Sequence, residues 1–216
     1  TLCNSNNYIN LFDIDFANID TGYCVGQSGT ILMTSDNGLS WDYKNSNIIS
    51  TINAISAKYI DNLWVVGDSG YALNSMDFGN TWIQKNMNTL SDLNDIVFIN
   101  PDTGFIAADS NLILTTFNGG NSWNKQIVDT GQNGSSLYSF EITNSSVYVV
   151  GGDIDPFYKA ARKLLKCTDF TNWMLLSNVF YIDAHDICII NDSIANSFGT
   201  FWPIKSPHIY IYNDDN

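Results

Sequence analysis

The sequence predicts an all-β fold, a five-bladed β-propeller of four-stranded antiparallel blades closed by the N-terminal strand. Three observations support this prediction. Trp41, Trp82 and Trp123 recur every 41 residues, and Trp173 follows 50 residues later. Several short apolar segments, separated by turn residues, accompany each of these tryptophans, and four strands in about 41 residues are typical of a propeller blade. Only 14% of the residues are charged, and turn-forming Asn, Ser, Thr and Asp take their place.

Each repeat begins with an apolar segment that is predicted to be its inner strand. These segments are LFDIDF, INAISA, LNDIVF and LYSFEI. The second and third strands of the first three repeats are predicted to join through the short turns GQSG, GDSG and ADSN. The approximate blade boundaries are 9–50, 51–91, 92–135, 136–180, and 181–216 plus 1–8. All five blades are expected to form one domain over residues 1–216.

The last repeat is predicted to be completed by the start of the chain. Its own segments are IDAHDICII, SIANSF and HIYIYNDDN, which provide three strands. Residues 1–8 follow the place where the repeat would put a tryptophan, so they are expected to pair with HIYIY as the fourth strand. Such closure covers the edge strands that would otherwise pair with other chains.

A second motif lies between the third and fourth segments of each repeat. TSDNGLSW, SMDFGNTW and TFNGGNSW follow the pattern Ser/Thr-x-Asp-x-Gly-x-x-Trp, whereas CTDFTNW has lost the glycine. The carboxylate is expected to accept hydrogen bonds from turn amides, the glycine to adopt positive φ, and the tryptophan to wedge between sheets. These structural residues are Asp36, Gly38, Trp41, Asp77, Gly79, Trp82, Asn118, Gly120, Trp123, Asp169 and Trp173.

This motif resembles the Asp-box, or BNR, repeat of β-propellers, in which the box lies on the hairpin between the third and fourth strands. Asp-box propellers include sialidases, whose site uses three arginines, but this chain has one, Arg162. The TGYCVG and GDSG segments are more similar to the photosystem II assembly factor family of propellers, which have larger rings and a basic patch. That resemblance implies a β-propeller architecture.

Composition excludes several kinds of site. The net charge of −13 opposes binding to nucleic acid. One glutamate, Glu141, and two histidines exclude a pair of catalytic glutamates and a three-histidine metal centre. The four cysteines show no zinc-like spacing, and Cys24 aligns with apolar Val65, so we expect a buried thiol there and at Cys188. No metal or cofactor is predicted, and no apolar run approaches the ~18 residues of a membrane span.

Carboxylates on the inner strands keep an enzymatic alternative open. They are Asp13, Asp15, Asp95, Glu141 and Asp186. Across a central channel they would act as a glycosidase-like acid and base or bind Ca²⁺; the simpler interpretation is that they hydrate the channel. His185 beside Asp186 is interpreted as a polar pair, because no nucleophile accompanies it.

Insertions in the fourth and fifth repeats are the predicted recognition surface. GGDIDPFYKAARKLLK and FGTFWPIKSP replace the short turns of the other repeats. A short helix over 159–166 would align Lys159, Arg162, Lys163 and Lys166 on one stripe. The predicted ligand- or partner-binding residues are Phe157, Tyr158, Arg162, Lys163, Phe201, Trp202, Lys205 and His208. The alternative is that these aromatic rings cap the core.

We therefore predict a non-enzymatic binding or assembly module that recognises a glycan or protein partner through one propeller face. A glycosidase-like enzyme and a structural subunit that self-associates remain alternatives. Because Asp-box proteins are mostly secreted, the resemblance implies an extracellular or cell-surface location.

Overall fold

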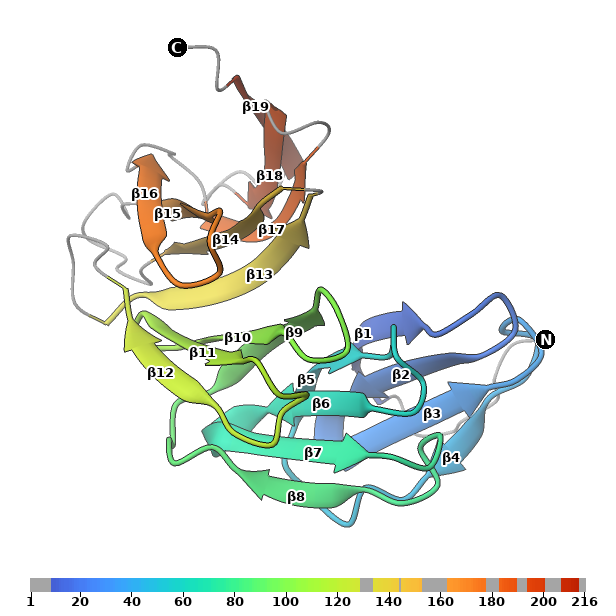
Figure 1. Cartoon of the computed structure of the whole chain (residues 1–216). Coiled ribbons are helices and arrows are strands. Elements are labelled where there is room, and N and C mark those ends of the chain that lie inside the picture. Colours follow the sequence, from blue (N-terminus) through green and yellow to red (C-terminus); the bar gives the residue numbers. More distant parts are fainter. Residues whose placement is uncertain are drawn as a thin grey trace. The chain divides into compact units, whose positions relative to one another are not determined.

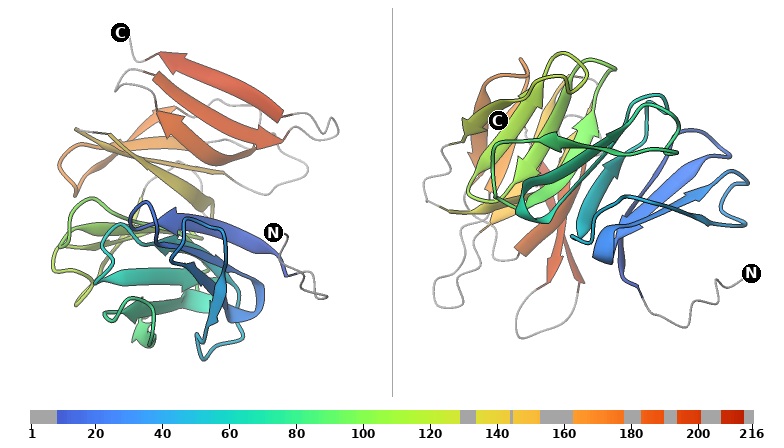
Figure 2. Two further views of the ribbon diagram at one scale, coloured as in Figure 1. Left: turned by 90° about the vertical axis from the view of Figure 1, so that its right-hand side faces the viewer. Right: turned by 90° about the horizontal axis from the view of Figure 1, so that it is seen from below.

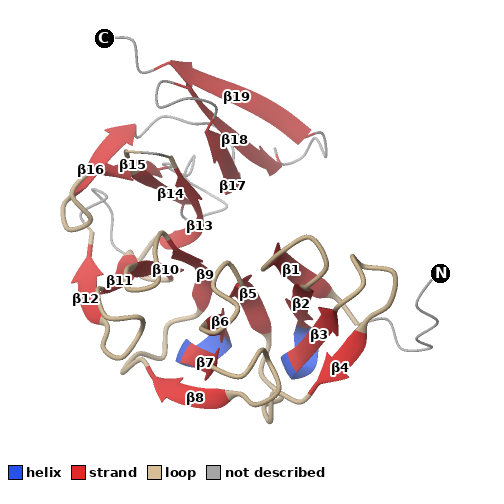
Figure 3. Ribbon diagram, turned by 45° about the vertical axis from the view of Figure 1, so that its right-hand side comes forward, coloured by secondary structure: helices blue, strands red, loops and turns tan. Residues whose placement is uncertain are grey.

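The computed structural model of the chain describes residues 9–128, 134–143, 145–152, 163–177, 183–189, 194–200 and 207–213. The regular elements in these ranges are β-strands, apart from two short 3-10 turns, η1 (Gln27–Gly29) and η2 (Asp68–Gly70) (Figure 3). The predicted all-β class is confirmed.

Four sheets contain four antiparallel strands each (Figure 1). The first sheet contains β1 (Leu11–Phe16), β2 (Gly22–Gly26), β3 (Thr30–Thr34) and β4 (Asp42–Lys44). The second contains β5 (Ile52–Ser56), β6 (Leu63–Gly67), β7 (Tyr71–Ser75) and β8 (Ile83–Asn86). The third contains β9 (Leu93–Phe98), β10 (Gly104–Ala108), β11 (Leu112–Thr116) and β12 (Asn124–Ile127). The fourth contains β13 (Ser136–Ile142), β14 (Val147–Gly152), β15 (Lys163–Cys167) and β16 (Trp173–Ser177).

A fifth sheet has three described strands, β17 (Asp183–Ile189), β18 (Ile194–Thr200) and β19 (Pro207–Asn213), paired in that order. They coincide with the three segments that the sequence predicts for the last repeat. Residues 1–8, the predicted fourth strand, lie outside the described residues.

The chain divides into two compact units. One comprises Thr1–Ile106 and Thr115–Asn124, and the other comprises Ala107–Leu114 and Lys125–Asn216. The third sheet contributes strands to both units. Within the first unit, the first two sheets lie side by side, β1 against β5, in both views of Figure 2.

Burial explains why the sequence forms these sheets. The second strands β2, β6, β10 and β14 are buried along their whole length, which suits strands covered on both faces. Cys24 lies in this buried set together with Val65, as predicted from their alignment. Burial and the nearby Asp13 carboxylate raise the pKa of the Cys24 thiol to about 11, so the thiol stays protonated at neutral pH.

Irregular register recurs in the inner strands. The pairing of β1 with β2 shifts between Leu11 and Asp13, and that of β5 with β6 shifts between Ile52 and Ala54, 41 residues later. Such bulges increase the local twist of a strand. The repeat therefore extends from the sequence to the backbone irregularities of the first two sheets.

Candidate functional site

Most of the predicted recognition residues lie outside the described residues. These are Phe157, Tyr158, Arg162, Phe201, Trp202 and Lys205. His208 lies on β19, where only the backbone is described. The predictions for these side chains therefore stay predictions.

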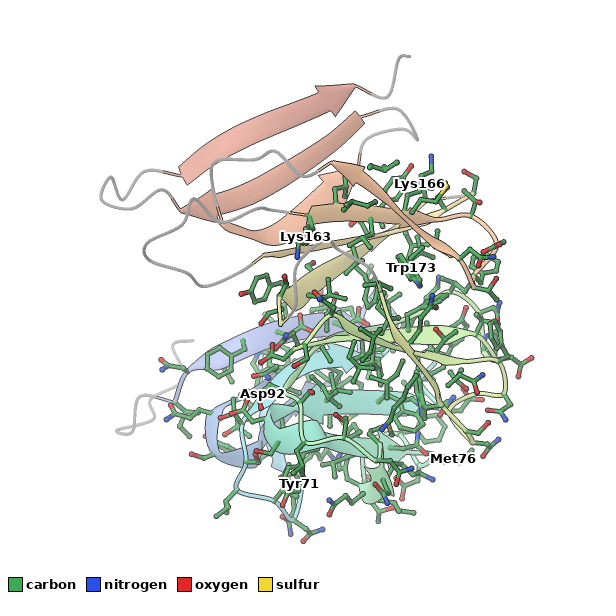
Figure 4. The ribbon with its side chains drawn as sticks, turned by 90° about the vertical axis from the view of Figure 1, so that its left-hand side faces the viewer. Tyr71, Met76, Asp92, Lys163, Lys166 and Trp173 are labelled. Carbon is green, nitrogen blue, oxygen red and sulfur yellow. The ribbon has the colours of Figure 1, made fainter. Side chains whose placement is uncertain are left out.

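The helix predicted over residues 159–166 is wrong for its last four residues. Lys163–Cys167 is strand β15, which pairs with β14 through Gly151 opposite Lys163 and Tyr148 opposite Lys166. In a strand, residues three apart point to opposite faces, so these two lysines share no stripe (Figure 4). Lys163 is buried and its Nζ donates to Ser135 Oγ, whereas the Lys166 Nζ lies 5.2 Å from the Tyr148 ring centroid.

Two of the inner-strand carboxylates bind backbone amides of the next sheet. Asp13 Oδ2 accepts a hydrogen bond from the Ile55 N–H at 2.8 Å, and Asp15 Oδ2 accepts one from the Ala57 N–H at 2.7 Å. Burial raises the pKa of Asp15, and the bond from Ala57 opposes that effect. These two carboxylates therefore connect β1 to β5, which is a structural task that the enzymatic interpretation had not assigned to them.

Among the described residues, no group of three or more His, Cys, Asp and Glu side chains lies close enough to hold a metal ion. In the same residues, no helix is long and apolar enough to cross a membrane.

The Asp boxes close the hairpins between the third and fourth strands of the first three sheets. In the first box, Asp36 accepts hydrogen bonds from the Ser40 N–H at 2.9 Å and the Ser40 hydroxyl at 2.6 Å. Thr34 Oγ1 donates to Asp36 Oδ1 at 2.8 Å and accepts from the Gly38 N–H at 2.9 Å. The carboxylate thus acts as an acceptor inside its own turn, as predicted.

Asn118 performs the same task in the third box. Its Oδ1 accepts from Thr116 Oγ1 at 3.0 Å and from the Ser122 N–H at 2.9 Å. Its Nδ2 donates to Ser122 Oγ at 2.9 Å, so the serine hydroxyl changes from donor to acceptor. A neutral amide therefore satisfies the box.

The fourth box is shorter. Phe170 has positive φ (61°), but no glycine follows it, whereas Phe78 and Gly79 of the second box both have positive φ. Asp169 Oδ1 accepts from the N–H groups of Thr171 and Asn172 at 2.9 and 2.7 Å. The turn therefore still closes around its carboxylate after losing one left-handed residue.

Acid should destabilise the box turns, because protonation removes the charge of their carboxylates. Hydrogen bonds from Ser40 lower the pKa of Asp36 to about 2, and those from Thr81 lower the pKa of Asp77. An unfolded aspartate has a pKa of about 3.9, so these carboxylates add stability above about pH 4 and lose it as the pH falls towards about 2. In the double variant Asp36→Asn and Asp77→Asn, for which Asn118 is the natural precedent, we expect a lower urea midpoint than wild type at pH 7 and a smaller decrease between pH 4 and pH 2, so that the two proteins converge at low pH.

Asp15 must be kept in both proteins of that comparison. Its pKa is raised, so its effect on stability as the pH falls has the opposite sign, because the folded state binds the proton more tightly than the unfolded state. An unchanged pH profile in the double variant would contradict the assignment of acid sensitivity to the boxes.

Each box glycine of the second and third sheets lies against an aromatic ring of the preceding sheet. A Cβ on Gly79 would lie 2.9 Å from Tyr23 Cε1, and a Cβ on Gly120 would lie 2.0 Å from Trp64 Cζ2. The Tyr23 hydroxyl also donates to the Phe78 carbonyl at 3.1 Å. We call the two pairs Tyr23–Gly79 and Trp64–Gly120 the box latches.

A partly buried amide network supports the second latch. Trp64 Nε1 donates to Asn62 Oδ1 at 2.9 Å, and Asn74 Nδ2 donates to the same oxygen at 2.8 Å. Asn62 Nδ2 in turn donates to the Gly119 carbonyl at 3.2 Å. The loop before β6 is therefore bonded to the box of the following sheet.

The aromatic half of the latches was not predicted from the sequence. Tyr23 and Trp64 are 41 residues apart, and Phe105 follows after another 41. All three are completely or almost completely buried at the second residue of a second strand. This recurring aromatic position was the signal that would have found the latches.

Comparison with solved structures shows the fold. YCF48 bound to D1 peptide is similar at a TM-score of 0.74 and 16% identity over 98% of this chain and 65% of that one. YCF48 from Cyanidioschyzon merolae has a TM-score of 0.65 and 18% identity over 95% and 73%. A GH74 enzyme of Niastella koreensis has a TM-score of 0.72 and 15% identity over 95% and 37%. The present chain thus has a propeller-like fold and spans less than two thirds of the first of these relatives.

Comparison with curated protein sequences gave no match. The model of the family described as Photosynthesis system II assembly factor YCF48 matches residues 3–90 and 80–154. The extracellular or cell-surface location predicted from the Asp boxes is therefore wrong, because the family is defined by an assembly factor of a photosynthetic complex and the box repeat alone carries no location. Since the matched residues make up most of the chain, this protein belongs to the photosystem II assembly factor YCF48 family.

Proposed function

We propose that this chain is a non-enzymatic assembly factor that binds a protein partner. The observation that carries the proposal is the family match over residues 3–154. A solved relative with the same fold is described as bound to D1 peptide, which makes this peptide the first probe. The use of Asp13 and Asp15 as acceptors for Ile55 and Ala57 supports binding over carboxylate catalysis.

We propose that the inserted loops of the fourth and fifth repeats take part in binding. In the first two repeats the equivalent turns are minimal, Gln27–Gly29 and Asp68–Gly70, so forming a sheet requires no insertion. The proposed contacts are made by the aromatic rings and Arg162, with Lys163 excluded because its Nζ is buried against Ser135. The glycan ligand and the self-association considered from the sequence are separate outcomes of the binding experiments.

Loss of the loop side chains should weaken partner binding. With a D1 peptide as probe, Trp202→Ala and Arg162→Ala are each expected to raise the Kd roughly ten-fold or more while changing the melting temperature little, as for hot-spot residues on loops. Lys163→Met is the matched control, which should lower the melting temperature and leave the Kd of the folded fraction unchanged. Titration by fluorescence anisotropy measures the Kd of the loop variants and of the control. Wild-type protein that fails to bind the peptide would contradict the proposed function.

We also propose that the five sheets are blades of one domain over residues 1–216, closed by residues 1–8 as an outer strand. The support comes from β1. Ile14 and Phe16 are 53% and 39% exposed, whereas their repeat equivalents Ile55 and Ala57 are 3% and 0% exposed. The first sheet therefore exposes large apolar side chains at positions that are buried in the second sheet, as expected for a face that another sheet covers.

Deleting residues 1–8 tests the closure. We expect the truncated protein to unfold less cooperatively and to aggregate, because the edge of β19 would be left open. The readouts are thermal melting by circular dichroism and light scattering. Melting identical to that of the full chain would argue against closure by this segment.

A further inference from the structure

We propose that the Asp-box end of the first three sheets binds a cationic amphipathic protein segment, one that combines lysines or arginines with apolar side chains. We call this surface the box end. It consists of the loops 17–21, 35–41, 57–62, 76–82, 99–103 and 117–123. The inference rests on the proposed function, since it names a binding surface and the chemistry of the partner.

Hydrogen bonds join these loops into one continuous surface. The Asn37 N–H donates to the Asp20 carbonyl at 3.0 Å within the first sheet, and the Gly119 N–H donates to the Asp102 carbonyl at 2.9 Å within the third. The latch bond from Tyr23 to the Phe78 carbonyl joins the first sheet to the second box. The bond from Asn62 to the Gly119 carbonyl joins the second sheet to the third box. Binding at this end therefore needs little ordering of the loops.

Large apolar side chains are exposed at the box end. They are Ile19 (79% exposed), Leu39 (76%), Met76 (72%), Phe78 (50%) and Phe117 (47%). Figure 4 shows Met76 at the end of the second sheet opposite to Tyr71 and Asp92.

Box formation does not require these apolar residues. Met76 and Phe117 occupy the variable second position of their boxes, where the first box has the exposed polar residue Ser35. The turn itself is closed by Ser75 and Asp77 in one case and by Thr116 and Asn118 in the other. Exposed apolar groups that folding does not require are typical of an interaction surface.

The charge of the box end selects a cationic partner. Asp20, Asp61 and Asp102 are exposed in its loops, and Asp36 and Asp77 remain ionised within their boxes. Lys58 is the one basic residue in these loops. Burial raises the pKa of Asp15, and the positive charge of Lys58 is one of the weaker effects that oppose this rise. Complementary charge increases the rate of encounter and orients the partner, while apolar contacts provide most of the affinity.

The opposite end of the same sheets provides an internal comparison. Ile49 and Leu90 are 92% and 86% exposed there, beside the turns at Gly29 and Gly70. Lys85 lies next to the last residue of β8, which also ends on this side, whereas the Lys44 Nζ donates to Asn80 Oδ1 in the second box at 3.4 Å. This end has comparable apolar exposure, and in the first two sheets it carries two carboxylates, Asp68 and Asp92, against the five of the box end, so it serves as the control surface.

The test uses synthetic helical peptides of about five turns. One carries lysine on one face and leucine on the other, the second has serine in place of leucine, and the third has glutamate in place of lysine. We expect the Lys/Leu peptide to bind the full chain at least ten-fold more tightly than the other two, as measured by fluorescence anisotropy. Its affinity should decrease with added salt, since exposed charges are screened.

Matched variants locate the site. The pair Met76→Ser and Phe117→Ser should weaken the Lys/Leu peptide by ten-fold or more and leave the Lys/Ser peptide unchanged. The pair Asp61→Asn and Asp102→Asn should weaken binding and reduce its salt dependence. The control pair Ile49→Ser and Leu90→Ser should leave the affinity within two-fold of wild type.

Hydrogen exchange of the wild-type protein gives a readout that needs no variant. Protection by the Lys/Leu peptide should concentrate in the box-end loops. The inference is overturned if the Lys/Ser peptide binds equally well, if the control pair weakens binding as much as the box-end pair, or if protection falls elsewhere. If the D1 peptide binds and depends on Trp202 and Arg162 while the Lys/Leu peptide fails, the proposed function stands and this inference does not.

Discussion

Gly120→Ala is expected to destabilise the first unit by about 2–5 kcal/mol. Gly120 has a φ of +87°, where a side chain costs roughly 1–2 kcal/mol, and its Cβ would lie 2.0 Å from Trp64 Cζ2. Relieving such an overlap in a packed core costs roughly a further 1–3 kcal/mol. Urea unfolding monitored by tryptophan fluorescence measures the loss.

Gly38→Ala is the matched control. Gly38 has a similar φ of +82°, but a Cβ there would meet only Trp41 Cζ2 at 3.8 Å and Nε1 at 4.0 Å among the described atoms. The same substitution should therefore cost only the backbone strain of about 1–2 kcal/mol. Equal losses at Gly38 and Gly120 would mean that backbone strain alone sets the requirement for glycine and that the latch contributes nothing.

Trp64→Ala should cost about 3–5 kcal/mol, as truncation of a large core aromatic does. Trp64 is 1% exposed, stacks on Phe98 with ring centroids 6.3 Å apart, and meets Trp123 edge-to-face at 5.5 Å. The variant also removes the indole N–H that donates to Asn62. Calorimetric melting measures the effect.

Trp64→Phe separates ring packing from the hydrogen bond. Phe105 occupies the equivalent place in the third sheet, so a phenyl ring fits this backbone position. Asn62 Oδ1 still accepts from Asn74, which limits the cost of losing the indole donor to about 1 kcal/mol. A phenylalanine variant as unstable as the alanine variant would show that the hydrogen bond, and not the ring, holds the latch.

Local and periodic features of the fold were predictable from the sequence. Trp41, Trp82 and Trp123 located the sheets because one unit of structure repeats with one spacing. The box turns were predictable because their hydrogen bonds join residues at most four positions apart, as between Asp36 and Ser40. The function of Asn118 followed from its place in the pattern.

Contacts between segments that are far apart in the sequence were harder to predict. Lys163 and Lys166 have helical spacing, yet pairing with β14, whose partner residues lie 12 and 18 positions away, places them in a strand. Asp13 and Asp15 were considered channel carboxylates because no sequence pattern indicates that a side chain bonds to a backbone amide 42 positions later. Packing of non-local segments decided both cases.

The latches and the carboxylate bonds of β1 connect only neighbouring sheets. We therefore expect that the stability of each sheet in the first unit depends mainly on the sheets next to it, and less on the core as a whole. Proteins built this way have nearest-neighbour coupling, in which each repeat is stabilised by the repeats on either side. Opening of the Trp64–Gly120 latch would then loosen the second and third sheets together, while the first sheet keeps its Asp13 and Asp15 bonds until β5 itself separates. A partner that spans several boxes would contact neighbouring sheets at the same time. Sheets that otherwise open separately would then unfold together, as one cooperative unit.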